Sequence, residues 1–287
     1  MGKIQAMPIQ KTFKSLRYFC LSSLLLLPLA IQAKVKDPCP DWGARVKSFP
    51  VAICQSANVQ PSNGRTVRGR TIYFQDTGPV NASSRVLVIG TIHGDEQSSA
   101  SLAFHWLNYA QKNNLNTHWR FIPIVNPDSL MSKPSRRTNA NGVDLNRNFP
   151  TPNWDQEAKK HWEIRTRKDP RRFPGNQSLS EPESKFIVEQ INTFKPTLIV
   201  SIHAPYGVLD FDGPKAPPKR LGFLYLDQVG IFPGSLGNYS GVHRGIPVVT
   251  VELPNSLDIP PPLEITKMWT DLTAWMNQTF SETAKRP

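Results

Sequence analysis

Short apolar runs alternate with amphipathic stretches along most of this chain. Continuous runs of Val, Ile and Leu predict strands buried on both faces, and apolar residues spaced three or four apart predict helices. The predicted strands cover residues 71–76, 85–91, 119–125, 197–203, 222–226 and 246–253, and the predicted helices cover 96–112, a stretch after an N-cap at Ser180, and 262–279. This alternation predicts an α/β fold with a mixed, largely parallel sheet sandwiched by helices.

Two segments break this pattern. Residues 34–70 are rich in Pro, Ser and Asn, which is typical of loops. Residues 126–175 form a long polar segment with few apolar runs, and so long a loop inside a compact domain is usually functional. Ligands of such sheets bind at the carboxyl ends of the strands. Functional residues are therefore expected at those strand ends and within 126–175.

The beginning of the chain resembles a targeting segment. Four basic residues and no acid precede the apolar run 19–31, which is followed by Gln32-Ala33. A basic start, a short apolar run and a small residue before a polar stretch predict a secretory signal peptide cleaved near Ala33. A membrane anchor is disfavoured, because the run contains Pro28 and is shorter than the roughly 20 residues that span a bilayer. The mature chain is therefore predicted to be periplasmic or secreted, without a stable membrane anchor.

Removal of that segment leaves two cysteines, Cys39 and Cys54. In an exported chain such a pair most simply forms one disulfide, which here would pin the N-terminal arm. A metal site is less favoured, since no histidine and no third cysteine lies near them in the sequence. The predicted organisation is a signal peptide over 1–33, an N-terminal arm over 34–60 and the functional domain over 61–287.

Charge narrows the class of partner. The chain has 34 basic and 22 acidic residues, a formal net charge of +12 that invites an anionic partner. The basic residues are scattered, without aromatic residues between them and without a helical stripe, so a nucleic acid is disfavoured. An anionic substrate of the cell envelope agrees better with this charge.

Polar residues with metal-binding chemistry stand at the ends of three predicted strands. They are His93 with Glu96, His203, and Glu252. Taken singly, such residues are more often structural, but their coincidence at three strand ends of one sheet favours a site. Two imidazoles and a carboxylate suit one Zn²⁺ ion per chain and leave a coordination position open for water. Glu252, outside that ligand set, is the natural general base.

The order of these motifs resembles that of the zinc carboxypeptidase family, whose fold is carboxypeptidase A-like. The resemblance covers residues 60–275, roughly, and is carried by His93-x-x-Glu96, Asn126-Pro127-Asp128, the run Asn141-Gly142-Val143-Asp144-Leu145-Asn146-Arg147-Asn148-Phe149, His203 and Glu252. Within the family, residues 137–150 are most similar to bacterial murein tripeptide amidases, which cut γ-D-glutamyl-meso-diaminopimelate in peptidoglycan fragments. With the signal segment, the resemblance implies an exported zinc metallopeptidase that hydrolyses an amide bond next to a free carboxylate in a peptide or muropeptide.

The resemblance also implies the chemistry of the reacting centre. It makes His93, Glu96 and His203 the zinc ligands and Glu252 the general base and acid. Arg137 matches the arginine that stabilises the oxyanion of the intermediate.

Four further positions match residues around the family's substrate. Asn146 and Arg147 match the pair that holds the terminal carboxylate of the substrate. Tyr239 matches the family's mobile tyrosine over the substrate. Asp144 is implied as a partner that holds an arginine or a metal ligand from behind.

Rival functions stay open at this point. A zinc deacylase of small N-acyl amino acids, of the aspartoacylase or succinylglutamate desuccinylase type, shares His-Gly-x-Glu and Asp-Leu-Asn-Arg, although Asn126-Pro127-Asp128 and the signal segment favour the peptidase. An ordinary C-terminal carboxypeptidase has the same motifs. A non-catalytic peptidoglycan-binding module is disfavoured because Glu252 and Arg137 are both present. The sequence leaves open which residue the enzyme releases and how the chain assembles.

Overall fold

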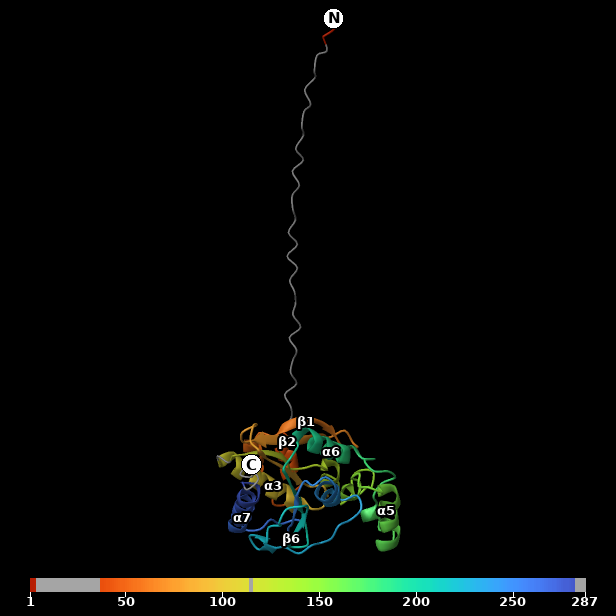
Figure 1. The fold of residues 1–287 in the computed structure, drawn as a ribbon, viewed down its shortest axis with the longest axis vertical. Coiled ribbons are helices and arrows are strands. Elements are labelled where there is room, and N and C mark those ends of the chain that lie inside the picture. Colours follow the sequence, from red (N-terminus) through yellow and green to blue (C-terminus); the bar gives the residue numbers. More distant parts are fainter. Residues whose placement is uncertain (4–36, 114–115, 282–287) are drawn as a thin grey trace, which may run out of the picture. The chain divides into compact units, whose positions relative to one another are not determined.

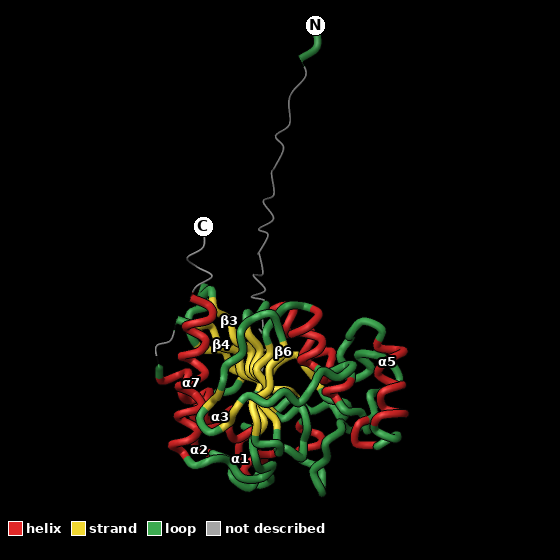
Figure 2. Tube along the Cα trace, turned by 60° about the horizontal axis from the view of Figure 1, so that its bottom comes forward, coloured by secondary structure: helices red, strands yellow, loops and turns green. Residues whose placement is uncertain are grey.

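The computed structural model describes residues 1–3, 37–113 and 116–281. The predicted signal peptide and its cleavage position lie outside the described residues, apart from residues 1–3. Within the unit Lys36–Pro287, a central sheet lies between two layers of helices (Figure 1 and Figure 2). None of the helices in the described ranges is long and apolar enough to cross a membrane.

The sheet has seven strands, and its centre is parallel. The strand order is β1-β2-β4-β3-β5-β9-β6, formed by β1 (Gln60–Arg65), β2 (Thr71–Thr77), β3 (Ser84–Gly90), β4 (Thr117–Ile122), β5 (Leu198–His203), β6 (Val208–Asp212) and β9 (Val248–Glu252). Strands β4, β3, β5 and β9 pair in parallel, whereas β1 and β2 on one side and β6 on the other pair antiparallel. The mixed, largely parallel sheet predicted from the sequence is therefore confirmed.

Successive side chains of the central strands supply two separate cores. Val86 and Val88 of β3 join the core under α1 (Cys39–Gly43), α2 (Val51–Ala57), α3 (Gln97–Lys112) and α7 (Pro262–Ser281). Leu87 and Ile89 join the opposite core under α6 (Pro182–Phe194). This follows from the strand repeat of two residues, which sends neighbouring side chains to opposite faces. Both faces of the central strands are covered, so most of their side chains are apolar.

The segment expected to be a loop over 34–70 instead contains α1, α2 and β1. Cys39 and Cys54 form the predicted disulfide, which joins α1 to α2. Trp42 of α1 packs against Phe104 of α3, with ring centroids 5.9 Å apart. Helices of five and seven residues carry too few apolar positions to show a helical period, which explains why the sequence pattern missed them.

The polar segment 126–175 also carries structure of its own. It contains α4 (Pro127–Leu130), α5 (Trp154–Lys160), 3₁₀ turns at Leu145–Arg147 and Pro170–Arg172, and a π-helical turn at His161–Arg165. Residues 126–130 and 143–151 are largely buried, whereas 152–172 are mostly exposed or half-buried.

Two further expectations differ from the structure, and one strand was not expected. The run 222–226 is not a strand of the main sheet, because a turn at Gly222 with φ of 58° separates β7 (Arg220–Leu221) from β8 (Leu224–Tyr225). Strand β6 was not expected, because two aspartates interrupt its apolar residues. Ser180 does not cap α6: the preceding residue is Glu181, which makes no side-chain cap hydrogen bond.

Candidate functional site

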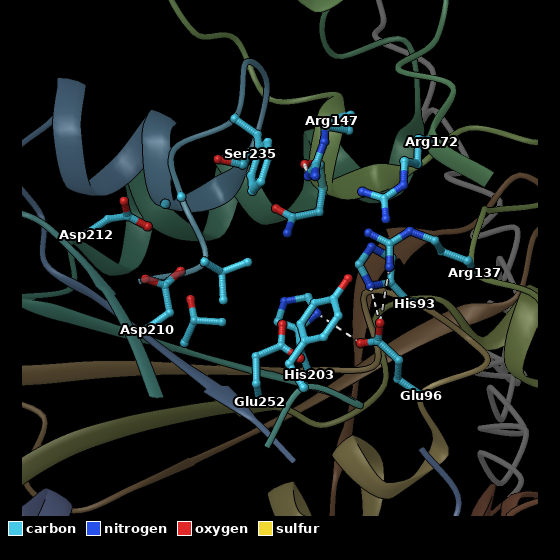
Figure 3. A pocket seen from close by; sticks show the side chains of 17 residues that line it. His93, Glu96, Arg137, Arg147, Arg172, His203, Asp210, Asp212, Ser235 and Glu252 are labelled. Carbon is cyan, nitrogen blue, oxygen red and sulfur yellow. Dashed lines mark hydrogen bonds and ion pairs between the residues drawn. The ribbon is translucent and has the colours of Figure 1, made fainter. Parts of the chain in front are cut away.

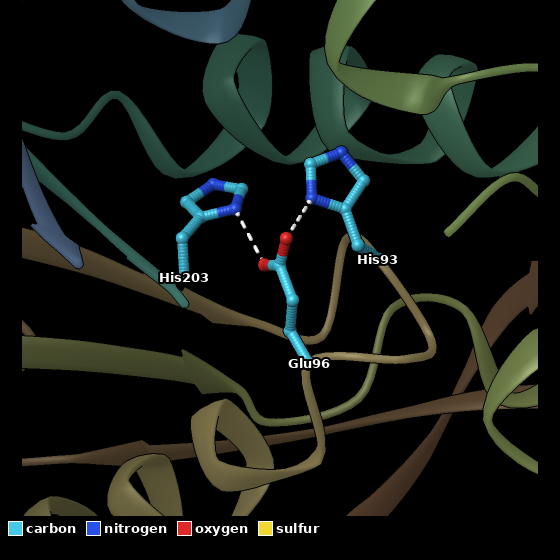
Figure 4. Close-up of side chains that lie close together, drawn as sticks. All are labelled: His93, Glu96 and His203. Atoms are coloured by element: carbon cyan, nitrogen blue, oxygen red, sulfur yellow. Dashed lines mark hydrogen bonds and ion pairs between the residues drawn. The ribbon is translucent and has the colours of Figure 1, made fainter. Parts of the chain in front are cut away.

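The carboxyl ends of β3, β5 and β9 bring the polar residues predicted from the sequence together. His203 and Glu252 are the last residues of two neighbouring parallel strands and face each other in register. His93 lies in the turn after β3, and Glu96 is the residue before α3. Figure 4 shows His93 and His203 on either side of the Glu96 carboxylate.

The three side chains form a compact buried group, called here the His-Glu-His cluster (His93, Glu96 and His203). Oε1 of Glu96 lies 2.8 Å from Nδ1 of His93, and Oε2 lies 2.9 Å from Nδ1 of His203. One ligand atom from each residue lies within 4.8 Å of the others. All three side chains are buried, so their polar atoms face one another instead of water.

The outer nitrogen of each imidazole is held by a neighbouring side chain. Oδ1 of Asp144 lies 3.0 Å from Nε2 of His93, and Oγ of Ser201 lies 2.8 Å from Nε2 of His203. Such contacts fix which ring nitrogen faces inward and are typical of histidines that bind metals. Both imidazoles therefore present Nδ1 to the same point.

The chemistry of this cluster fits a zinc ion. An ionised carboxylate only accepts hydrogen bonds, so His93, placed between Glu96 and Asp144, meets an acceptor at each ring nitrogen. Burial and the Arg137 charge lower the pKa of His93, but Glu96 and Asp144 raise it by more. A cation at Nδ1 would take the place of the extra proton. Two imidazoles and one carboxylate are a common zinc ligand set with an open position.

Glu252 lies beside the cluster with a free oxygen (Figure 3). Its Oε2 is buried and has no hydrogen-bond partner among the described residues. Burial raises the pKa of this carboxyl group; the imidazole of His203 opposes the shift and the Glu96 charge adds to it. A carboxylate that is short of partners can accept a proton, which is the property that a general base needs.

Arg137 is tied to the cluster through Asp144. Its Nε donates to Oδ2 of Asp144 at 3.0 Å, and its Nη1 lies 3.3 Å from Oε1 of Glu96. Burial lowers the pKa of Arg137, but the Asp144 and Glu96 charges raise it by more. One buried aspartate thus holds both a histidine of the cluster and this arginine.

Arg147 lies in the same cavity but is held differently. Its guanidinium stacks over the ring of Phe232, 4.4 Å from the centroid, and Nη1 donates to the backbone oxygen of Asn146. Its Nε is buried without a hydrogen-bond partner in the described part of the chain. Burial lowers the pKa of Arg147 to about 10, and the charges of Arg137 and Arg172 act in the same direction. A buried cation with an unused donor would gain from an anion.

These groups line one cavity, called here the central cavity. Its walls include the His-Glu-His cluster, Glu252, Arg137, Asn146, Arg147, Arg172, Asp210 and Asp212. In Figure 3 the arginines gather on one side of the cluster and the two aspartates on the other. The cavity therefore presents separate positive and negative walls.

Tyr239 is not among the residues that line this cavity. Its ring stacks on Phe149, with centroids 6.0 Å apart, and its hydroxyl accepts a hydrogen bond from Arg244 at 2.8 Å. The side chain is buried in the core under α6. The π-helical turn Gly237–His243 that carries it thus faces the core at this residue, contrary to the expectation that Tyr239 lies over the substrate.

The sequence pattern missed three charged residues of the central cavity and two aromatic residues, one of which is the Phe232 under Arg147. Asp210 and Asp212 are two apart on β6, a spacing that puts both on one face of a strand and was the available signal. Burial raises the pKa of Asp212 to about 6, and the charge of Asp210 adds to the shift. Arg172 and Tyr206 also line the cavity, and both come from turns without a pattern of their own.

Comparison with known proteins agrees with this geometry. The sequence profile described as zinc carboxypeptidase matches residues 57–211. A murein peptide amidase A from Vibrio campbellii is 32% identical over 201 residues, which cover 67% of this chain and 78% of that relative. A murein peptide amidase A from Escherichia coli K12 is 33% identical over 152 residues, covering 51% of this chain and 60% of the relative.

Solved structures show the same fold. A murein-tripeptide amidase from Escherichia coli O157 is similar with a TM-score of 0.56 and 23% identity, covering 82% of this chain and 95% of that one. A carboxypeptidase A from Helicoverpa armigera is similar with a TM-score of 0.58 and 17% identity, covering 81% and 73%. The profile match, which spans more than half of the chain, shows that this chain belongs to the zinc carboxypeptidase family, a family of hydrolases.

Proposed function

We propose that this chain hydrolyses an amide bond next to a free carboxylate, with zinc held by His93, Glu96 and His203. The observation that carries the proposal is the unpartnered Oε2 of Glu252 beside the His-Glu-His cluster. The unused Nε of Arg147 in the same cavity supports it. A base, a ligand set and an anion site thus share one cavity.

Glu252 acts as the proton carrier of the reaction. Zinc, when bound, supplies a Lewis acid that acidifies water and polarises the scissile carbonyl. Oε2 of Glu252 accepts a proton from the attacking water and later passes it to the leaving amine. Arg137, whose Nη1 lies close to the cluster, stabilises the negative charge that develops on the carbonyl oxygen.

Arg147 and Asn146 orient the substrate. The guanidinium of Arg147 binds the carboxylate next to the scissile bond, and the Asn146 side chain assists it. Asn146 is itself fixed, since its Oδ1 accepts a hydrogen bond from the Leu236 backbone at 2.8 Å. A held carboxylate places the amide carbon at the reacting groups and removes much of the entropic barrier.

The substrate we favour is γ-D-glutamyl-meso-diaminopimelate in peptides derived from peptidoglycan. Relatives at 32% and 33% identity are murein peptide amidases. Diaminopimelate also carries a second ammonium group, for which Asp210 and Asp212 supply acceptors at the far side of the central cavity.

We also propose that the protein acts outside the cytoplasm. The pattern of residues 1–33 supports export. The disulfide between Cys39 and Cys54 supports it independently, because such bonds persist mainly in oxidising compartments.

One alternative has support of its own. Asp210 and Asp212 would equally accept the side chain of a C-terminal lysine or arginine. An ordinary carboxypeptidase that removes basic residues is therefore the second candidate.

The test is mass spectrometry of L-Ala-γ-D-Glu-meso-diaminopimelate incubated with residues 34–287. We expect free diaminopimelate from zinc-loaded protein, no release after treatment with a chelator, and recovery when zinc is restored. Glu252→Gln, which keeps the size of the side chain, is the matched inactive control. Release of lysine from an ordinary peptide, without any release of diaminopimelate, would replace the murein substrate by the second candidate.

A further inference from the structure

Arg172 is the third arginine of the central cavity, and its guanidinium is only loosely held. Its one charged partner among the described residues is Asp169, with Nε 3.5 Å from Oδ2, and its side chain is 37% exposed. No hydrogen bond from its side chain to another described residue is present. Arg137, by contrast, is bound by Asp144 and Glu96.

The position of Arg172 relates it to a second cavity. This space of about 160 Å³, called here the acyl-side cavity, is lined by Asp95, Arg171, Pro205 and Ser256. It shares Glu96, Arg137, Arg172 and Tyr206 with the central cavity. Arg172 therefore stands where the two cavities meet, and Figure 3 shows its side chain near that of Arg137.

The two cavities lie on opposite sides of the scissile bond in the proposed function. Arg147 lines the central cavity and not the acyl-side cavity, so the leaving residue with its carboxylate occupies the central one. The scissile carbonyl lies at the groups common to both, Glu96 and Arg137. The acyl residue of the substrate then extends into the acyl-side cavity, past Arg172.

Asp169 also lines the acyl-side cavity, but it contacts Arg172 only through Nε, so the two Nη groups of Arg172 have no hydrogen-bond partner among the described residues. Arg171 donates to Oδ2 of Asp95 at 2.8 Å, so that arginine is already paired. Oδ1 of Asp95 is buried without a partner in the described residues and would accept an N–H from the substrate. The cavity thus offers two N–H donor groups, the Nη groups of Arg172, and one acceptor, Oδ1 of Asp95.

We propose that Arg172 binds a carboxylate on the acyl residue of the substrate and selects for γ-linked glutamate. This inference rests on the proposed function. A γ-linked glutamate keeps its α-carboxylate free, a short CH₂–CH₂ link from the scissile carbonyl, and carries an N–H on the same α-carbon. Arg172 takes the carboxylate as a planar fork, and Asp95 accepts the N–H. An α-linked peptide has no carboxylate at this place.

The test compares two substrates that differ in this one group. The first is L-Ala-γ-D-Glu-meso-diaminopimelate, and the second is the same peptide with D-isoglutamine, in which the α-carboxylate is a carboxamide. We expect wild-type protein to prefer the first. Arg172→Gln should lower kcat/KM for the carboxylate substrate by about 10-fold, mainly through KM, and leave the carboxamide substrate unchanged. Arg172→Lys should restore part of the preference.

Arg167→Gln is the matched control, because the substitution removes the same charge as Arg172→Gln. Arg167 is exposed and lines neither cavity. It should leave the preference intact. Equal losses on both substrates in Arg172→Gln, or equal rates for both in the wild type, would overturn the role of Arg172 and leave the proposed function standing. Failure of zinc-loaded wild-type protein to cleave either substrate would overturn both.

Discussion

The His-Glu-His cluster and the pair Asp210 and Asp212 stand on the same sheet, but they are held in different ways. In the cluster, each imidazole nitrogen has a hydrogen-bonding partner, supplied by Glu96, Asp144 or Ser201. The aspartate pair has no basic partner among the described residues, and burial raises the pKa of both carboxyl groups.

Strand position explains this contrast. The cluster follows central parallel strands, whose ends are packed on both sides and leave little freedom for side chains. The pair lies on β6, the antiparallel strand at the edge of the sheet. A fully bonded group suits a fixed task such as holding an ion, whereas an unpaired charge suits a partner that arrives with the substrate.

The largest expected effect concerns Glu252, which lies between these two regions. Glu252→Gln should lower kcat by about 10²- to 10⁴-fold, because the amide cannot accept the proton from water. Zinc content should be unchanged, since Glu252 is outside the ligand set. Steady-state kinetics with metal analysis of the same samples checks both statements. A variant that loses zinc together with activity would show that Glu252 belongs to the ligand set instead.

The next effect tests how the cluster is held. Asp144→Asn should weaken zinc binding by about 10- to 100-fold, because it removes the charge behind His93. Competition with a coloured chelator measures the affinity. Ser201→Ala, which removes the neutral partner behind His203, is the matched comparison and should cost less. A larger loss in Ser201→Ala would contradict the view that the Asp144 charge dominates.

A smaller effect tests the aspartate pair. Asp212→Asn should reduce kcat/KM for the diaminopimelate substrate by about 10-fold, because it removes a charged acceptor. A substrate that ends in 2-aminopimelate lacks the second ammonium group and should be cleaved equally by both proteins. Asp155→Asn, at an exposed position on α5, is the control. Equal losses on the two substrates would contradict recognition of a cation by this pair.

The smallest effect is a dependence on pH. The pKa of Asp212 is raised to about 6, so its carboxyl group is neutral below that pH and charged above it. The preference for diaminopimelate over 2-aminopimelate should therefore decline as the pH falls through about 6 and be constant at higher pH. Asp212→Asn should show no such change. An unperturbed aspartate has a pKa of about 3.9 and would already be charged across this range. A wild-type preference that is constant from pH 5 to 8 would therefore contradict the role of Asp212.

The sequence predicted the regular centre of the molecule well. Runs such as 85–91 and 197–203 are buried on both faces, so their composition alone indicates strands, and the fold class is confirmed. His93, Glu96, His203 and Glu252 are adjacent in the structure because parallel strands end at one edge.

The parts that were missed depend on contacts rather than on pattern. Strand β6 is mostly buried although Asp210 and Asp212 make it look polar in the sequence. Tyr239 was assigned by its resemblance to a family position, but packing on Phe149 places it in the core. Arg172 is positioned by a short turn that only the tertiary structure defines. The signal peptide over 1–33 stays a prediction.

The packing of α1 and α2 against α3 connects the disulfide-closed N-terminal arm to the His-Glu-His cluster. Glu96 stands directly before α3, and the opposite end of that helix is bonded to the arm, where Gln111 donates to the backbone of Ala57 at 3.1 Å. The arm is also closed by a bond that only oxidation can form. Closing the arm by a disulfide therefore also stabilises the packing around α3, the helix that Glu96 directly precedes.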